Sequence, residues 1–393
     1  MKGKPVWKKL LIGLGCVALA CVIGVVILTV WTMNRQPTIS WDTPADTPAD
    51  TPADTPADTP VQPPALDFEV VDSDEPLVID TYTLWEMGNH KTLSIYDSAY
   101  LGMFFDYDSV TAEETKQVVR ENKAITPRFR ELLLWYIDAI AAKYPEADLR
   151  ILHYNLQTLE VVEVDASELA FQSVSLISYG CYKRAENKIY VNKDYEYKPG
   201  TWEYQVIIHE FGHAARTIQR EIDGDTIYVQ LSEDYLEIPE EALNSLFTVS
   251  LFDYEERDIA YQLPSNLFQV IVECAEDYSL GDYINHSLTY LAHKLDEQTG
   301  HNNYAMAIFR LIDAQRADYL DDSYEREQEV YYPIYDYVCA LYLDRYGTAD
   351  MDEAAREALA EKLVERITYD VPEDHPLDTE EFFRFARDYD IRR

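Results

Sequence analysis

The chain has 393 residues, of which 33 are Lys or Arg and 72 are Asp or Glu, so its formal net charge is −39. Hydrophobic residues make up 47% of the chain and charged residues 27%, which is typical of a globular protein. The length allows one large domain or two small ones. The negative charge excludes nucleic acid as a partner, because a phosphate backbone would be repelled, and it opposes docking onto anionic lipid headgroups.

The first recognisable segment is an apolar run near the N-terminus. Leu10–Trp31 is a stretch of 22 uncharged residues without proline, preceded by four lysines. As a helix it would span about 33 Å, enough to cross a bilayer core. It is longer than the apolar region of an ordinary signal peptide, so we expect an uncleaved anchor, with a cleaved signal or a lipoprotein modified at Cys21 as alternatives. The lysines predict a cytoplasmic tail at residues 1–9 and place the rest outside the cytoplasm, which suits a bacterial cell surface.

A repetitive linker follows the apolar run. From Asp42 to Pro60 the chain repeats the unit DTPA, and we assign residues 34–65 to this linker. A proline every fourth residue opposes helices and sheet ladders and favours an extended polyproline-like chain. The segment therefore predicts a stalk or spacer that ends near residue 65.

The rest of the chain predicts an α+β fold, with helices first, then a small sheet, then more helices. Apolar and β-branched runs predict strands at 149–154 and 159–164, and a hairpin made of 174–183 and 188–193. Apolar positions at helical spacing predict helices at 111–123, 127–144, 201–221, 266–279, 284–297, 303–318, 326–346 and 351–368.

The predicted helix at 201–221 carries the sequence His209-Glu210-Phe211-Gly212-His213. Two histidines four residues apart lie on one face of a helix, so both imidazoles can bind one metal ion. Glu210 lies beside them and can take a proton from an attacking water molecule and pass it to a leaving amine. Zinc suits such a site because it accepts imidazole and carboxylate ligands with one position left open.

This motif, on a capped apolar helix that follows a predicted sheet, resembles the zincin metallopeptidases. The resemblance covers roughly residues 145–300 and implies a zincin-like catalytic domain at 66–300, followed by a helical lobe at 301–393. It also implies that Lys188–Asn192 is the edge strand that aligns a substrate peptide. Gly212, which is unfavourable inside a helix, would leave room beside the metal.

The third metal ligand separates the zincin subfamilies. Metzincins have a histidine where this chain has Gln219 and a glycine where it has Arg216, so that pattern fails. The resemblance to gluzincins, and to lethal-factor-type protease domains, implies Glu273 as the ligand and Asp277, one turn later, as the residue that supports a ligand histidine. Further alternatives for the ligand are Glu240 or Glu241, and Asp223, Asp225 or another acidic residue.

The sequence thus predicts a membrane-anchored, extracytoplasmic zinc metallopeptidase that acts on peptides or proteins, with Glu210 as general base. A residue that stabilises the transition state is also expected, with four unresolved candidates, Tyr261, Tyr278, His286 and His293. The alternatives are a surface protein that keeps a zincin fold and metal for binding, and a structural protein of the cell envelope. The oligomeric state does not follow from the sequence.

Overall fold

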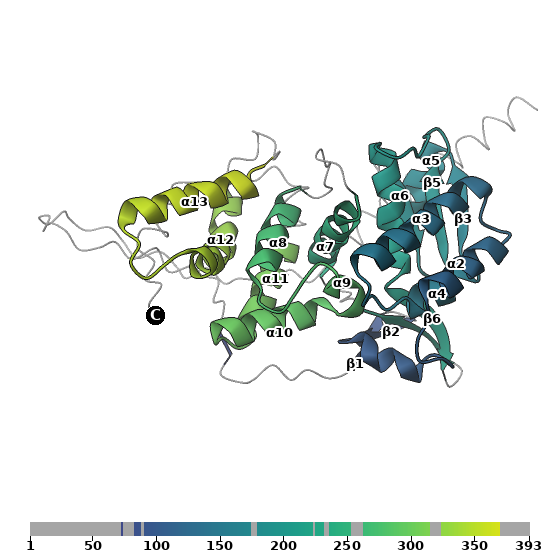
Figure 1. Cartoon of the computed structure of the whole chain (residues 1–393), viewed down its shortest axis with the longest axis horizontal. Helices are drawn as coiled ribbons and strands as arrows, with labels where there is room; N and C mark the ends of the chain where they lie inside the picture. The colour runs from purple at the N-terminus through teal and green to yellow at the C-terminus, as the bar shows by residue number, and fades with distance from the viewer. Residues whose placement is uncertain are drawn as a thin grey trace, which may run out of the picture. The chain divides into compact units, whose positions relative to one another are not determined.

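A computed structural model describes residues 72–73, 82–87, 90–173, 179–222, 225–231, 236–252, 262–314 and 324–369. The predicted anchor at 10–31 and the linker at 34–65 lie outside these residues. Among the residues that the structure describes, no helix has both the length and the apolar character needed to cross a membrane. The elements described below combine many helices with two small sheets, which confirms the α+β prediction (Figure 1).

The smaller sheet has three strands in the order β3-β5-β4. β3 (Glu160–Val164) runs parallel to β5 (Lys188–Asn192), and β4 (Gly180–Lys183) runs antiparallel to β5. The predicted strand at 159–164 is confirmed, and the predicted hairpin is confirmed for residues 180–183 and 188–192, whereas residues 174–178 of its first strand lie outside the described residues. β5 is however the central strand and not the edge strand, because it pairs on both sides. Among the described strands, β3 and β4 are the two edge strands of this sheet.

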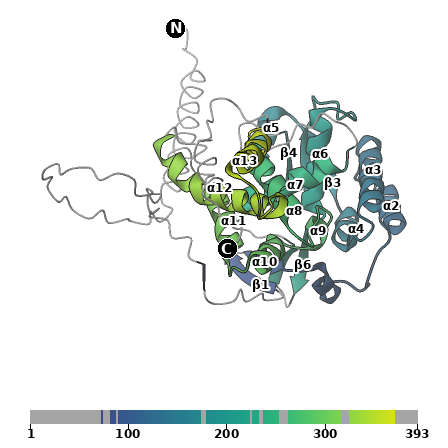
Figure 2. The same cartoon turned by 60° about the vertical axis from the view of Figure 1, so that its left-hand side comes forward.

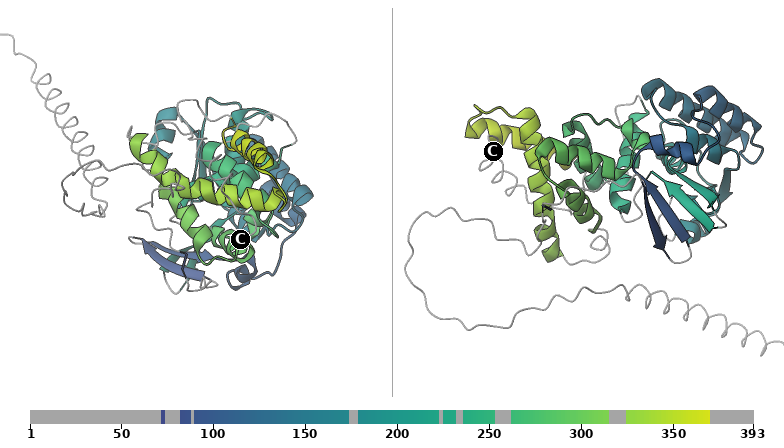
Figure 3. Two further views of the ribbon diagram at one scale, coloured as in Figure 1. Left: turned by 90° about the vertical axis from the view of Figure 1, so that its left-hand side faces the viewer. Right: turned by 90° about the horizontal axis from the view of Figure 1, so that it is seen from below.

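The larger sheet has four strands in the order β1-β2-β7-β6, seen together in the right-hand view of Figure 3. It consists of β1 (Tyr82–Met87), β2 (His90–Ile95), β6 (Thr217–Ile222) and β7 (Asp225–Gln230), with β2 and β7 parallel and the other pairs antiparallel. Residues 217–221 were predicted to continue a helix, and this prediction is wrong. Ile218 is fully buried in a core with the sheet residues Leu93, Ile95 and Val229, so packing favours the strand.

The predicted strand at 149–154 is also wrong, because α4 (Arg150–Leu156) occupies this position. Ile151, Leu152, Asn155 and Leu156 are buried, a spacing that fits one helical face. The Asn155 amide donates to the backbone oxygens of Ala214 and Thr217, at 2.7 and 2.6 Å. α4 thereby holds the chain at the point where it leaves α6 (Trp202–Ala214) and enters β6.

Helices form the rest of the described fold. α2 (Ala112–Glu121) and α3 (Pro127–Lys143) confirm two predicted helices, and α5 (Ala166–Ser173) packs on the three-stranded sheet. α7 (Glu237–Ser250) lies between α6 and α8 (Gln262–Cys274), as Figure 1 shows. Twelve of the α7 residues are buried, so this helix is central to the core.

The later helices pack into the same core as the earlier ones. They are the short α9 (Asp282–Asn285), α10 (Leu288–Thr299), α11 (Tyr304–Ala314), α12 (Tyr324–Tyr346) and α13 (Glu353–Ile367). α11 packs on α7, and α12 and α13 pack on α8, which Figure 2 shows from a second side. The predicted helices from 266 onward are therefore present, with shifted ends. One continuous hydrophobic core extends from Val119 to Ile367.

Candidate metal centre

Three side chains meet between α6 and α7. Nε2 of His209 lies 2.8 Å from one carboxylate oxygen of Glu241, and Nε2 of His213 lies 3.3 Å from the other. The two Nε2 atoms are 3.1 Å apart. Among the described residues, these three form the group of His, Cys, Asp and Glu side chains that can hold a metal ion.

The two histidines come from the last turns of α6. Thr201 begins this helix as its N-cap, because its hydroxyl accepts a hydrogen bond from the Tyr204 N–H. Ile207, Ile208 and Phe211 are fully buried and fix the apolar side of the helix. His209 and His213, four residues apart, consequently point the same way, with ring centroids 4.8 Å apart.

Glu241 is the fifth residue of α7 and approaches the imidazoles from this neighbouring helix. One turn later, the Asn244 amide donates to the backbone oxygen of His209 at 2.9 Å, and the Ser245 hydroxyl lies 3.4 Å from Nδ1 of His209. A contact to the second ring nitrogen orients a ligand histidine. Successive turns of α7 therefore hold both the backbone and the ring of His209.

Gly212 allows this close approach of the two helices. A Cβ atom at this position would lie 2.0 Å from Oδ1 of Asn244. Gly212 was expected to leave room beside the metal, but the space that it leaves is filled by the Asn244 side chain.

Glu210 lies next to the three-residue cluster but contacts the sheet. Its carboxylate accepts a hydrogen bond of 2.7 Å from the backbone N–H of Tyr182 in β4, and the side chain is only 8% exposed. Gly180 provides the space, since a Cβ there would lie 3.1 Å from Cγ of Glu210. Burial raises the pKa of Glu210, while the neighbouring rings of His213 and His209 act in the opposite direction. A carboxylate with a raised pKa is better suited to accept and return a proton near neutral pH.

The charges of the cluster are strongly coupled. Burial disfavours the charged form of His213, but the Glu241 carboxylate outweighs this effect and raises the pKa of His213 to about 9. Burial likewise disfavours the charged form of Glu241, and the two imidazoles outweigh it, so the pKa of Glu241 lies well below its usual range. Without a metal, the cluster is therefore an ion pair at neutral pH.

The donor set and its spacing fit a zinc ion. Zinc in proteins is usually tetrahedral with metal–ligand distances near 2.0–2.2 Å, which separates two ligand atoms by about 3.3 Å. The three separations in this cluster are 2.8, 3.1 and 3.3 Å. Two neutral imidazoles and one carboxylate would leave a fourth position for water or substrate. His209, His213 and Glu241 are accordingly the residues that would hold the ion.

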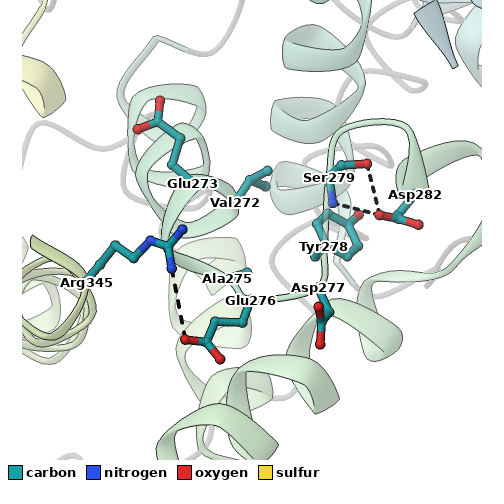
Figure 4. A pocket seen from close by; sticks show the side chains of 9 residues that line it. All are labelled: Val272, Glu273, Ala275, Glu276, Asp277, Tyr278, Ser279, Asp282 and Arg345. Atoms are coloured by element: carbon teal, nitrogen blue, oxygen red, sulfur yellow. Dashed lines mark hydrogen bonds and ion pairs between the residues drawn. The ribbon is translucent and has the colours of Figure 1, made fainter.

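Glu273, the ligand expected from the gluzincin resemblance, lies elsewhere. Its carboxylate forms an ion pair with Arg366 of α13 at 2.5 Å. It lines a pocket that includes none of the three cluster residues, shown in Figure 4. α7 lies between α6 and α8, and α13 packs on α8, so the Glu273 carboxylate meets a side chain of α13. We therefore replace Glu273 by Glu241, which was one of the alternatives, as the third ligand.

Asp277 does not support a ligand histidine either. The Gln298 side chain caps α8, because it donates to the Cys274 oxygen at 3.0 Å and accepts from the Glu276 N–H at 2.8 Å. Asp277 follows with a left-handed backbone (φ 54°) and points into the pocket of Figure 4. The predicted helical relation between Glu273 and Asp277 is therefore absent.

The other candidates are distributed over the fold. Glu240 pairs with Arg216, and Asp225 pairs with Lys91 at the end of the larger sheet. Asp223 and Tyr261 lie outside the described residues.

Three candidates for a transition-state stabiliser are described, and their direct contacts lie away from the cluster. Tyr278 lines the pocket of Figure 4, and His293 pairs with Glu297 at 3.2 Å. The His286 ring stacks on Tyr290, with centroids 3.7 Å apart. The structure thus gives none of the three a contact with the candidate metal ligands.

The sequence analysis missed the roles of Asn244, Ser245 and the Tyr182 N–H. One signal was present, since residues 240–250 place several polar side chains in an otherwise apolar helix. Polar groups inside a buried helix need partners, so their spacing pointed toward a neighbouring polar feature.

Comparison with protein families, with curated proteins and with solved structures finds no match for this chain. The cluster of His209, His213 and Glu241, together with Glu210, is consequently the feature that indicates a function.

Proposed function

We propose that this protein is a zinc metallopeptidase of the zincin type, anchored in the membrane and active outside the cytoplasm. The observation that carries this proposal is the position of Glu210 beside three side chains that suit zinc. A metal ion that only stabilises a fold needs its ligands and no proton acceptor beside them. A catalytic site does need one, and the buried Glu210 carboxylate with its raised pKa is suited to proton transfer. A gluzincin-like ligand set remains part of the proposal, with Glu241 in place of Glu273.

When bound, zinc supplies a Lewis acid that polarises a carbonyl group and lowers the pKa of water. Glu210 takes the proton from the attacking water and returns it to the leaving amine. The Tyr182 N–H holds one Glu210 oxygen, which keeps the carboxylate in one orientation. The Asn244 and Ser245 contacts orient His209.

The side of β4 that faces away from β5 is the proposed site for the substrate backbone. An unpaired strand edge presents N–H and C=O groups that can pair with an extended peptide. Among the described strands, β4 is hydrogen-bonded to β5 alone, and its Tyr182 N–H is directed to Glu210. A peptide aligned along β4 would therefore run past the general base.

The cellular location is proposed from the sequence. The run of 22 uncharged residues after four lysines supports an N-terminal anchor, and the DTPA repeats support a spacer between the membrane and the folded part.

The direct test is hydrolysis of a mixed peptide library by the zinc-loaded protein. Wild type should cleave a subset of the peptides, and a chelator should stop the cleavage. Glu210→Gln should bind zinc normally and lose cleavage, because an amide has the shape of the carboxylate but cannot accept the proton. Zinc binding without cleavage in the wild type would instead favour a zincin-like protein that uses its metal for binding.

A further inference from the structure

Arg216 is a fully buried cation close to the candidate metal centre. It follows the end of α6 and lies three residues after His213. Its side chain is 2% exposed, and its backbone N–H donates to the His213 oxygen at 3.1 Å. A buried guanidinium is costly unless several acceptors surround it, so the groups around Arg216 are informative.

The guanidinium contacts three parts of the fold, namely the end of β7, the start of α7, and α9 with its C-terminal cap. It donates to the backbone oxygen of Leu231 after β7 and to that of His286 after α9, the latter at 3.1 Å. It pairs with the Glu240 carboxylate at 3.3 Å, and it lies over the Tyr283 ring at 3.8 Å from the centroid. Arg216 therefore joins the end of α6 to the beginning of α7.

The contact between Arg216 and Glu240 concerns the metal centre because the next residue, Glu241, is the candidate third ligand. They are adjacent residues of one turn near the start of α7, and the helical backbone fixes the direction of one side chain relative to the other. Glu240 is 8% exposed and points to Arg216, while Glu241 points to the two histidines. A rotation of this turn would move both carboxylates at once.

We propose that Arg216 is a positioning residue for the metal centre, which acts through Glu240 to hold the Glu241 carboxylate against His209 and His213. This inference rests on the proposed metal-dependent function. It identifies Arg216 as the residue that sets the orientation of the third ligand, although Arg216 itself is not a ligand.

The planar fork of arginine is essential to this role. Arg216 reaches a carboxylate and two carbonyl oxygens in different directions, which a single ammonium group cannot reproduce. Arg216→Lys keeps the charge and loses the fork, whereas Glu240→Gln keeps the shape and loses the charge. Comparing the two variants therefore shows whether the charge of the pair or the geometry of its hydrogen bonds matters for zinc binding.

The test is zinc affinity, measured by competition with a chromophoric chelator, for wild type, Arg216→Lys, Glu240→Gln and the double variant. Each single variant should bind zinc about 10–100-fold more weakly, as is typical when a residue behind a metal ligand is changed. The double variant should be no weaker than the weaker single variant, because both changes break the same contact. Melting temperature and circular dichroism identify the folded fraction.

Arg150→Lys is the matched control. Arg150 is also buried, at 6% exposure, and holds Asp148 and the Ser98 oxygen, neither of which belongs to α6 or α7. It should lower the melting temperature and leave zinc affinity within twofold of wild type. The d–d absorption spectrum of the cobalt-substituted protein should change in Arg216→Lys and stay unchanged in Arg150→Lys.

The outcomes separate this inference from the proposed function. If wild type binds zinc and folded Arg216→Lys binds it equally well, Arg216 does not position the site and this inference fails alone. Additive losses in the double variant would also overturn it, because Arg216 would then act independently of Glu240. If wild type binds no zinc, the proposed function fails and this inference fails with it.

Discussion

A Cβ atom at Gly212 would lie 2.0 Å from Oδ1 of Asn244, so the glycine of the histidine motif leaves the space that the Asn244 side chain of α7 occupies. The Asn244 amide group is held in place by its bond to the His209 oxygen. The packing of the two helices and the position of a candidate ligand are therefore linked through this glycine.

Gly212→Ala should destabilise the protein. In an isolated helix, alanine would be favoured over glycine by about 1 kcal/mol. The clash with Asn244 acts against this gain, and overpacking a tight interface costs about 1–3 kcal/mol. We expect the clash to dominate, since Asn244 is fully buried and hydrogen-bonded, so thermal unfolding should show a lower melting temperature and zinc titration a weaker affinity.

The matched control for this prediction is Gly212→Ala combined with Asn244→Ala. Removing the amide relieves the contact, so the double variant should be more stable than Gly212→Ala alone. A Gly212→Ala protein more stable than wild type would contradict the close packing of the two helices.

Zinc binding should weaken as the pH falls. In the metal-free protein the Glu241 carboxylate raises the pKa of His213 to about 9, and the ring must lose its proton to bind a metal. Zinc affinity should therefore fall about tenfold per pH unit from about pH 8.5 to about pH 6.5, because one proton is displaced. A zinc competition series at several pH values measures this slope, and a flat profile would contradict the coupling.

The stability of the metal-free protein should follow the opposite trend. A histidine with a raised pKa contributes stability that is fully present below its unfolded pKa of about 6.5 and is lost as the pH rises through about 9. Between about pH 6.5 and pH 9, the melting temperature of chelator-treated wild type should therefore fall more than that of Glu241→Gln, which lacks the carboxylate charge. Parallel curves for the two proteins would show that Glu241 does not raise the pKa of His213.

The full-length chain should remain in the membrane fraction after an alkaline wash, and protease added outside should digest residues 66–393. Both results are expected from the 22-residue apolar run and the lysines before it. A variant without residues 1–33 should be released. Full-length protein found soluble in the cytoplasm would refute the predicted topology.

Local patterns in the sequence predicted much of the fold. The capped helix with His209 and His213, the β4–β5 hairpin and most of the later helices depend on caps, spacing and turns within a few residues. The misassigned segments were short apolar runs that fit either a strand or a helix. α4 and β6 were decided by contacts with distant segments, such as the bonds from Asn155 to Ala214 and Thr217.

The third ligand depended on tertiary packing in the same way. Glu241 and Glu273 both lie in largely apolar stretches of the sequence, so the apolar context does not distinguish them. What distinguishes them is that α7 packs against α6, whereas α8 packs on the other side of α7 and directs Glu273 to Arg366. The sequence carries no local sign of this order of helices.

The central claim is that His209, His213 and Glu241 bind one zinc ion, and the most direct measurement is the zinc content of purified variants. Wild type and Glu273→Ala should each hold one zinc per chain, since Glu273 pairs with Arg366. Glu241→Ala should lose most of its zinc while remaining folded. Zinc retained in full by Glu241→Ala, together with loss in Glu273→Ala, would contradict the proposed metal centre.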